Sequence, residues 1–148
     1  MNINNVKALF YAVTATIGGL VTHLLGGWSH DMNTLLIFMA IDFISGLALA
    51  TIFKNSTKTH GGALESRACM KGLFRKGMIL VFVMVGNRLD LTLGTDYIRT
   101  TVIIGFIANE LISIIENAGL MGVKFPKVIA DSVEILKSKS GDDEKEVD

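Results

Sequence analysis

Residues 32–53, MNTLLIFMAIDFISGLALATIF, carry one ionisable side chain, Asp42, at the centre of an otherwise apolar run. As a helix that rises about 1.5 Å per residue, this run is long enough to cross the ~30 Å hydrocarbon core of a bilayer. The stretch therefore predicts a membrane-spanning helix. Because a charge at mid-membrane is costly, we expect Asp42 to face protein or water rather than lipid, or to be protonated.

The composition of the whole chain also favours a membrane protein. Half of its 148 residues are hydrophobic, 19% are charged, and the formal net charge is zero. This balance gives no indication of nucleic-acid binding. The lone Cys69 cannot form an internal disulfide, and the three histidines have no metal-binding spacing. We expect no cofactor, no metal and one compact membrane domain over residues 1–125.

Two further stretches are long and apolar enough to span. Residues 6–28 carry one charge, Lys7, at their start and end at Trp28, a residue typical of the membrane interface. We interpret this stretch as a retained helix, because a signal peptide has a shorter apolar part and a small-residue cleavage site. It is expected to form an antiparallel hairpin with residues 32–53. Residues 98–116 form the other apolar span.

A third span in chain order is less apolar than the others. Residues 77–87 are uncharged but too short to cross a bilayer as a helix. If Arg88 extends its side chain to the far interface, the span becomes residues 77–95. The predicted fold class is then an all-α integral membrane bundle with four transmembrane helices.

A basic segment precedes this third span. Residues 54–76 hold six of the fourteen Lys and Arg and a single acid. The positive-inside rule predicts that this segment is cytoplasmic. Arg67, Lys71 and Arg75 recur every four residues and share one helical face. This face fits both an interfacial helix on anionic phospholipid and a solvated loop that only sets topology.

The remaining basic residues define the orientation of the chain. Twelve Lys and Arg fall near the N-terminus, in the basic segment or after Asn117, and two fall in the other connections. We therefore expect both termini in the cytoplasm. Residues 126–140 have the pattern of a short amphipathic helix, and the acidic residues 141–148 are expected to be disordered.

Polar and small residues share faces on the second and last spans. The predicted polar face consists of Asp42, Gly46, Asn109, Glu110, Ser113, Glu116 and Asn117. In lipid, such a face packs against another helix or lines a wet path, which favours a homo-oligomer. The chain offers no nucleophile beside a base, no phosphate-binding loop and no metal set. We therefore expect no catalytic residues and no enzymatic activity.

Several short motifs between Asp42 and Leu136 resemble the toxin-secretion/phage-lysis holin family. The matching positions are Ser66, Gly72 and Lys76, the run NELISIIEN at 109–117, and Gly122 and Pro126 in GVKFPK. The resemblance implies a bacteriophage or clostridial protein that oligomerises in the bacterial cytoplasmic membrane. It also implies holes that release a soluble endolysin or toxin and collapse the membrane potential.

Two other function classes are compatible with the residues. One is a small four-helix transporter or channel in which Asp42 or Glu110 exchanges protons. The other is a membrane-bound interaction module that recruits a soluble partner through the basic segment or the tail. Proton-coupled transport without release of large solutes would indicate the first class. Co-purification with one soluble protein would indicate the second.

Overall fold

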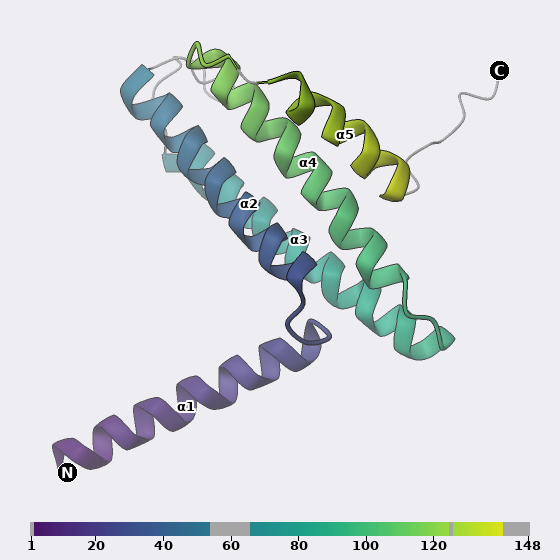
Figure 1. Cartoon of the computed structure of the whole chain (residues 1–148). Helices are drawn as coiled ribbons and strands as arrows, with labels where there is room; N and C mark the ends of the chain where they lie inside the picture. Colours follow the sequence, from purple (N-terminus) through teal and green to yellow (C-terminus); the bar gives the residue numbers. More distant parts are fainter. Residues whose placement is uncertain (1, 54–65, 125, 141–148) are drawn as a thin grey trace.

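A computed structural model describes residues 2–53, 66–124 and 126–140, and this part of the chain is built from helices without a strand (Figure 1). The helices are α1 (Ile3–Leu24), α2 (His30–Ala48), the short π-helix η1 (Leu49–Phe53) that continues α2, α3 (Ser66–Leu93), α4 (Ile98–Leu120) and α5 (Lys127–Ser140). The predicted all-α class is therefore confirmed.

Three helices among the described residues are long and apolar enough to cross a membrane. They are Ile3–Leu24, His30–Phe53 and Ile98–Leu120, which overlap the predicted spans 6–28, 32–53 and 98–116. The predicted span 77–95 lies largely within α3, which is not in this group. Lys76 directly precedes the apolar stretch of α3, and Arg88 and Asp90 interrupt it. Helix composition alone thus supports three spans rather than four.

The bundle consists of α2, α3 and α4, with α5 folded back along α4 (Figure 1). α2 and α4 run in the same direction, and α3 runs in the opposite direction. α4 is the central element, because it packs against α2, α3 and α5, whereas α2 and α3 contact each other little. α5 lies within residues 126–140, where the sequence predicts a short helix.

α1 extends away from the bundle, and none of its residues is buried (Figure 1). The predicted antiparallel hairpin of residues 6–28 with 32–53 is therefore not formed. Gly26 and Gly27 turn the chain at φ values of 81° and 88°, a conformation that glycine adopts without steric cost. The apolar side chains of α1 remain available to lipid or to other chains.

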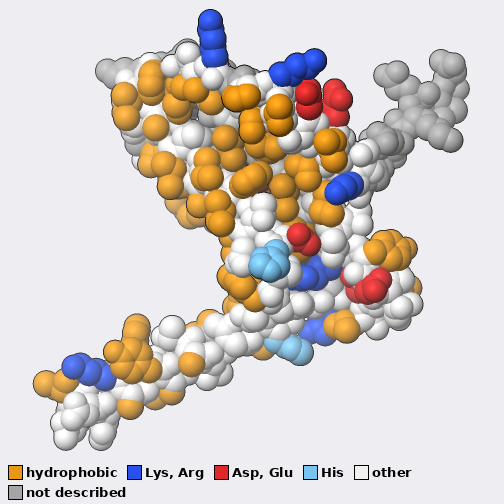
Figure 2. Space-filling model, in the orientation of Figure 1, with side chains coloured by type: hydrophobic (Ala, Val, Ile, Leu, Met, Phe, Trp, Pro, Cys, Tyr) orange, Lys and Arg blue, Asp and Glu red, His pale blue; other side chains and the backbone are white. Residues whose placement is uncertain are grey.

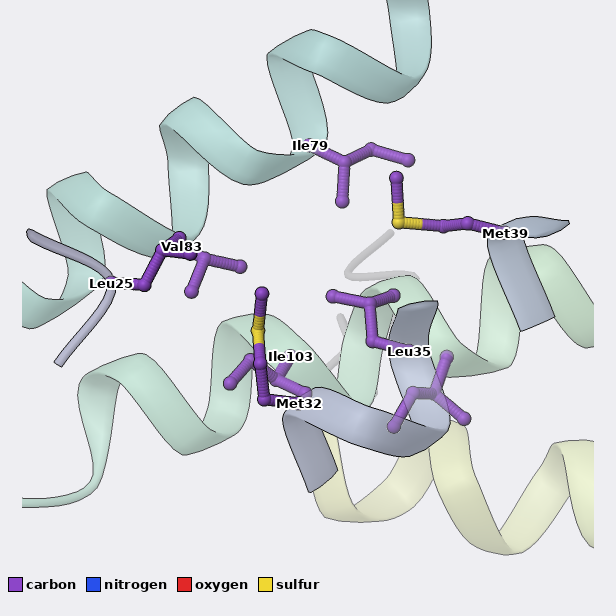
Figure 3. Packing of buried hydrophobic residues seen from close by; sticks show 8 residues of the cluster. Leu25, Met32, Leu35, Met39, Ile79, Val83 and Ile103 are labelled. Carbon is purple, nitrogen blue, oxygen red and sulfur yellow. The ribbon is translucent and has the colours of Figure 1, made fainter. Parts of the chain in front are cut away.

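The hydrophobic core lies between α2, α3 and α4, in the half of the bundle nearer to α1 (Figures 1 and 3). Its buried side chains are Leu25, Met32, Leu35, Met39, Ile79, Val83, Ile103 and Ile107. Apolar side chains also spread over the outer surface of the bundle (Figure 2). A surface of this kind is suited to contact with lipid.

In the described part of the basic segment, residues 66–76, the basic face belongs to α3 and not to a separate interfacial helix. Arg67, Lys71 and Arg75 belong to the first turns of α3, and this helix continues without interruption to Leu93. The preceding residues 54–65 and the predicted acidic tail 141–148 lie outside the described residues.

Candidate functional site

A cluster of charged side chains joins α2, α3 and α4. Lys76 Nζ on α3 lies 2.8 Å from Asp42 Oδ2 on α2 and 2.5 Å from Glu110 Oε2 on α4. Asp42 is 8% exposed and Glu110 is 4% exposed. One ammonium group therefore bridges two buried carboxylates from different helices, in hydrogen bonds that charge makes stronger than neutral ones.

Asn117 binds the same aspartate from the other side. Its Nδ2 donates to Asp42 Oδ1 at 3.1 Å and to Ser45 Oγ at 2.9 Å. Gly46 lies beside this amide, since a Cβ placed there would be 3.7 Å from Asn117 Nδ2. Asn117 thus fixes the orientation of the Asp42 carboxylate without charge of its own.

The three charged residues share the helix faces that form the core. Each lies three residues from a core residue of its own helix. The pairs are Met39 and Asp42 on α2, Ile79 and Lys76 on α3, and Ile107 and Glu110 on α4. Residues three apart lie on one helical face, so the packing that forms the core also brings the charges together.

An open cleft of about 360 Å³ lies against the cluster, between the same three helices. Asn109 and Ser113 line it from α4, and Lys71 and Arg75 line it from α3. Small residues on α2 and α3, among them Gly72, leave this space empty of side chains. The result is a cavity with both polar and apolar walls beside a buried ion cluster.

The residues of the predicted polar face lie in three different places in the structure. Asp42, Glu110 and Asn117 meet in the cluster with Gly46 beside them, and Asn109 and Ser113 line the cleft. Glu116 lies exposed on α4, outside both.

The predicted motif residues fall in several places. Lys76 is in the cluster and Gly72 lines the cleft, whereas Ser66 is exposed at the start of α3. Gly122 has a φ of 82° where α4 ends, and Pro126 is exposed before α5. Of the predicted basic face, Lys71 and Arg75 reach the cleft and Arg67 does not.

Sequence reasoning missed Lys76 as the counter-ion of both acids, because it placed this residue in a cytoplasmic loop. A signal was present: a nearby cation stabilises acids buried in apolar helices, and Lys76 directly precedes the apolar stretch of α3.

A second polar group of residues, also missed, lies at the other end of the bundle. Asp90 accepts hydrogen bonds from the backbone N–H groups of Ile98 and Arg99, at 3.0 and 2.8 Å. The Arg99 side chain donates to the carbonyl oxygens of Leu25 and Gly27, at 2.5 and 2.9 Å. These contacts tie the α3–α4 turn to the chain that follows α1.

The apolar helices and the ion cluster at their interface define a small helical membrane protein. Residues 19–138 match the model of the bacteriophage holin family, and the chain belongs to this family. The resemblance to holins read from the sequence motifs is thus confirmed.

Individual relatives are found in a phage and in bacteria. A probable holin of Bacillus phage phi105 is 32% identical over 108 residues, which cover 72% of this chain and 74% of that protein. An uncharacterised Listeria monocytogenes protein is 36% identical over 132 residues, 88% of this chain and 89% of its own. A 14.9 kDa Clostridium perfringens protein from the nagH 3′ region is 32% identical over 126 residues, 84% of this chain and 89% of its own. No solved structure matches significantly.

Proposed function

We propose that this chain is a holin that oligomerises in the bacterial cytoplasmic membrane and opens holes. The holes would release a soluble endolysin, or a toxin, and collapse the membrane potential. Membership of the holin family and similarity to a probable phage holin support this role. The structural observation that carries the proposal is the buried cluster of Lys76, Asp42 and Glu110 within apolar helices.

In the closed bundle, the charges of this cluster satisfy one another. Removing three charges from water is costly, and the mutual attraction offsets this cost only while the helices stay packed. α2 and α3 have few other contacts. If α3 moved away from α2, water would replace Lys76 around the two carboxylates. Asp42, Glu110 and the cleft residues Asn109 and Ser113 would then line a wet path.

The membrane potential would bias such a movement. A charge that crosses the membrane field changes the energy by ~2.3 kcal/mol per 100 mV. Movement of the Lys76 ammonium relative to the carboxylates through part of this field is therefore a voltage-dependent step.

Oligomerisation would use surfaces that the single chain leaves uncovered. α1 is apolar and has no buried residue, and no atom lies within 4 Å of a Cβ built at Gly18 or Gly19. Small residues let the backbones of neighbouring helices approach closely in lipid. We propose that α1 contacts other copies, and that the chain crosses the membrane four times with both termini in the cytoplasm.

The family points to a non-enzymatic role. In the proposed mechanism the functional partner is an endolysin or toxin, the basic residues of α3 contact anionic phospholipid, and neither a cofactor nor nucleic acid takes part.

The decisive test is induced expression in a bacterium that also makes a cytoplasmic endolysin, with membrane potential and culture turbidity recorded together. We expect a delay, an abrupt depolarisation, and then lysis that requires the endolysin. Steady growth with an intact potential, in cells whose membranes contain the protein, would contradict the proposal. Proton-coupled transport without release of large solutes would instead support the transporter class.

The same assay tests the role of the buried acids. We expect Asp42→Asn with Glu110→Gln to bring depolarisation forward, because Lys76 loses both carboxylates that hold it in the closed bundle. Glu116→Gln is the matched control, since Glu116 belongs to α4, as Glu110 does, but is exposed and lies outside the cluster. The time of depolarisation in this variant should stay unchanged. Unchanged timing in the double variant would exclude the cluster as the closed-state contact.

A further inference from the structure

Two cations of the cleft have no partner in the ion cluster. Lys71 and Arg75 line the cleft from α3, and both are exposed. Lys76, the third cation of the lining, is held by Asp42 and Glu110. Within the described residues, Lys71 and Arg75 take part in no salt bridge. The α3 wall of the cleft is therefore cationic. Over the whole lining, three positive side chains face two negative ones.

The depth of these cations makes their charge costly. Asp42 lies near the middle of the apolar helix His30–Phe53, and Lys76 contacts it. Arg75 directly precedes Lys76, and Lys71 is about 7.5 Å closer to the start of α3, so both long side chains extend toward the interface at that end of the helix. Charged groups at such depths need water, an interface or an anion within reach.

The opposite walls of the same cleft are apolar. Phe43 and Leu47 line it from α2, and Phe106 lines it from α4. The space is left open on α3 by Gly72, where an added Cβ would meet no atom within 4 Å. A ligand that fills this cleft must therefore combine an anionic group with an apolar chain.

We propose that the cleft binds an anionic phospholipid, with its phosphate between Lys71 and Arg75 and an acyl chain against Phe43, Leu47 and Phe106. An arginine fork matches two phosphate oxygens, and a lysine adds a point charge. Such a lipid reaches an open cleft between membrane helices directly from the bilayer. The inference rests on the membrane location in the proposed function, but it does not depend on hole formation.

The single cysteine of the chain provides a probe, because Cys69 lines the same cleft. The full chain would be reconstituted in vesicles of phosphatidylcholine alone or mixed equally with phosphatidylglycerol. The rate at which uncharged N-ethylmaleimide alkylates Cys69 would then be measured. We expect slower alkylation with phosphatidylglycerol, and loss of this protection in the variant K71Q/R75Q.

The matched control is the variant R67Q/K124Q, which removes the same charge from exposed positions outside the cleft and should keep the protection. Equal rates in the two vesicle types would overturn the proposal. Slowing that persists in K71Q/R75Q would also overturn it, since this indicates a general effect of the charged surface. Protection by inorganic phosphate in phosphatidylcholine vesicles would mean that the site takes a soluble anion instead of lipid.

A second variant fills the cleft and keeps both cations. In native mass spectrometry, the wild type should retain bound phosphatidylglycerol and the Gly72→Leu variant should lose it. Gly77→Leu is the control and should retain the lipid, because Gly77 lies outside the cleft with open space around it. For K71Q/R75Q, the retained ratio of phosphatidylglycerol to phosphatidylcholine should fall roughly 30-fold. Equal retention by all variants would refute the site. Lysis assays are separate, so failure of the lipid site leaves the holin proposal standing.

Discussion

The contribution of a lysine between two carboxylates to the stability of an apolar bundle depends on all three charges together. Each group loses hydration when the helices pack, and the contacts of Lys76 at 2.8 and 2.5 Å compensate for much of this loss. Asn117 adds a neutral hydrogen bond to Asp42. The removal of one partner is therefore more damaging than the removal of the whole cluster.

We expect Lys76→Met to destabilise the bundle by about 3 to 5 kcal/mol, because Asp42 and Glu110 are left buried without a cation. Combining it with Asp42→Asn and Glu110→Gln should restore most of this loss, since no uncompensated charge remains. Thermal unfolding in detergent, followed by circular dichroism, measures both effects.

Arg67→Met is the control for removal of a cation from α3, because Arg67 is exposed and belongs to neither the cluster nor the cleft. Its effect should stay within about 0.5 kcal/mol. If Lys76→Met were no more destabilising than Arg67→Met, the buried ion pairs would not hold the helices together.

At the scale of single elements, α4 begins without a capping side chain of its own. Its N-cap residue, Tyr97, makes no side-chain hydrogen bond. Asp90, near the end of α3, instead accepts from the first backbone N–H groups of α4 and from Thr95 Oγ1 at 2.6 Å. The end of one helix thus caps the start of the next, which fixes the turn between them.

Asp90→Ala should lower the unfolding temperature, because the first turn of α4 loses its hydrogen-bond acceptor. Asp96→Ala is the comparison, since Asp96 is an exposed acid in the same turn. Circular dichroism during heating would record both. Equal unfolding temperatures for the two variants would show that the carboxylate of Asp90 does not stabilise this turn.

α3 and α4 approach each other closely at Gly86. A Cβ added there would lie 3.1 Å from Arg99 Cα, a backbone atom that cannot move aside freely. Gly77, on the same helix, has open space around the equivalent position. The glycine at 86 therefore sets the distance between two elements of the bundle.

Gly86→Leu should destabilise the bundle by about 1 to 3 kcal/mol, because the added side chain forces α3 and α4 apart. Gly77→Leu serves as the control and should have little effect. The free energy of unfolding of each variant in detergent gives the comparison. Similar values for both would contradict a close helix crossing at Gly86.

At the scale of the whole molecule, α3 decides the number of spans. It is too charged to qualify by composition alone, but it packs along α4 and reaches α2 through Lys76. If α2 and α4 run in the same direction across the membrane, as the fold arranges them, α3 must cross between them (Figure 1). Four spans would place both termini on one side.

Reporter fusions test this topology. Alkaline phosphatase, which is active only outside the cytoplasm, should be active when inserted between Gly94 and Thr95 and inactive when fused after Asp148. A green fluorescent protein at the second site should be fluorescent. An active phosphatase after Asp148 would exclude the four-span arrangement with both termini in the cytoplasm.

The sequence by itself determined the class of this protein. The apolar runs at 32–53 and 98–116 exceed the thickness of a bilayer, and local hydropathy is sufficient to reveal them. Asp42 and Glu110 were recognisable as buried acids in need of partners for the same reason. Family motifs then indicated a holin, and the match to the family model agrees.

Only the tertiary structure decided which groups meet. Lys76 is 34 residues from Asp42 and 34 from Glu110 along the chain, so their contact depends on how three helices pack. The orientation of α1 likewise depends on the turn at Gly26 and Gly27 rather than on its hydropathy. Hydropathy is a local property of the chain, whereas charge pairing and helix placement arise from contacts between distant residues, which no local pattern specifies.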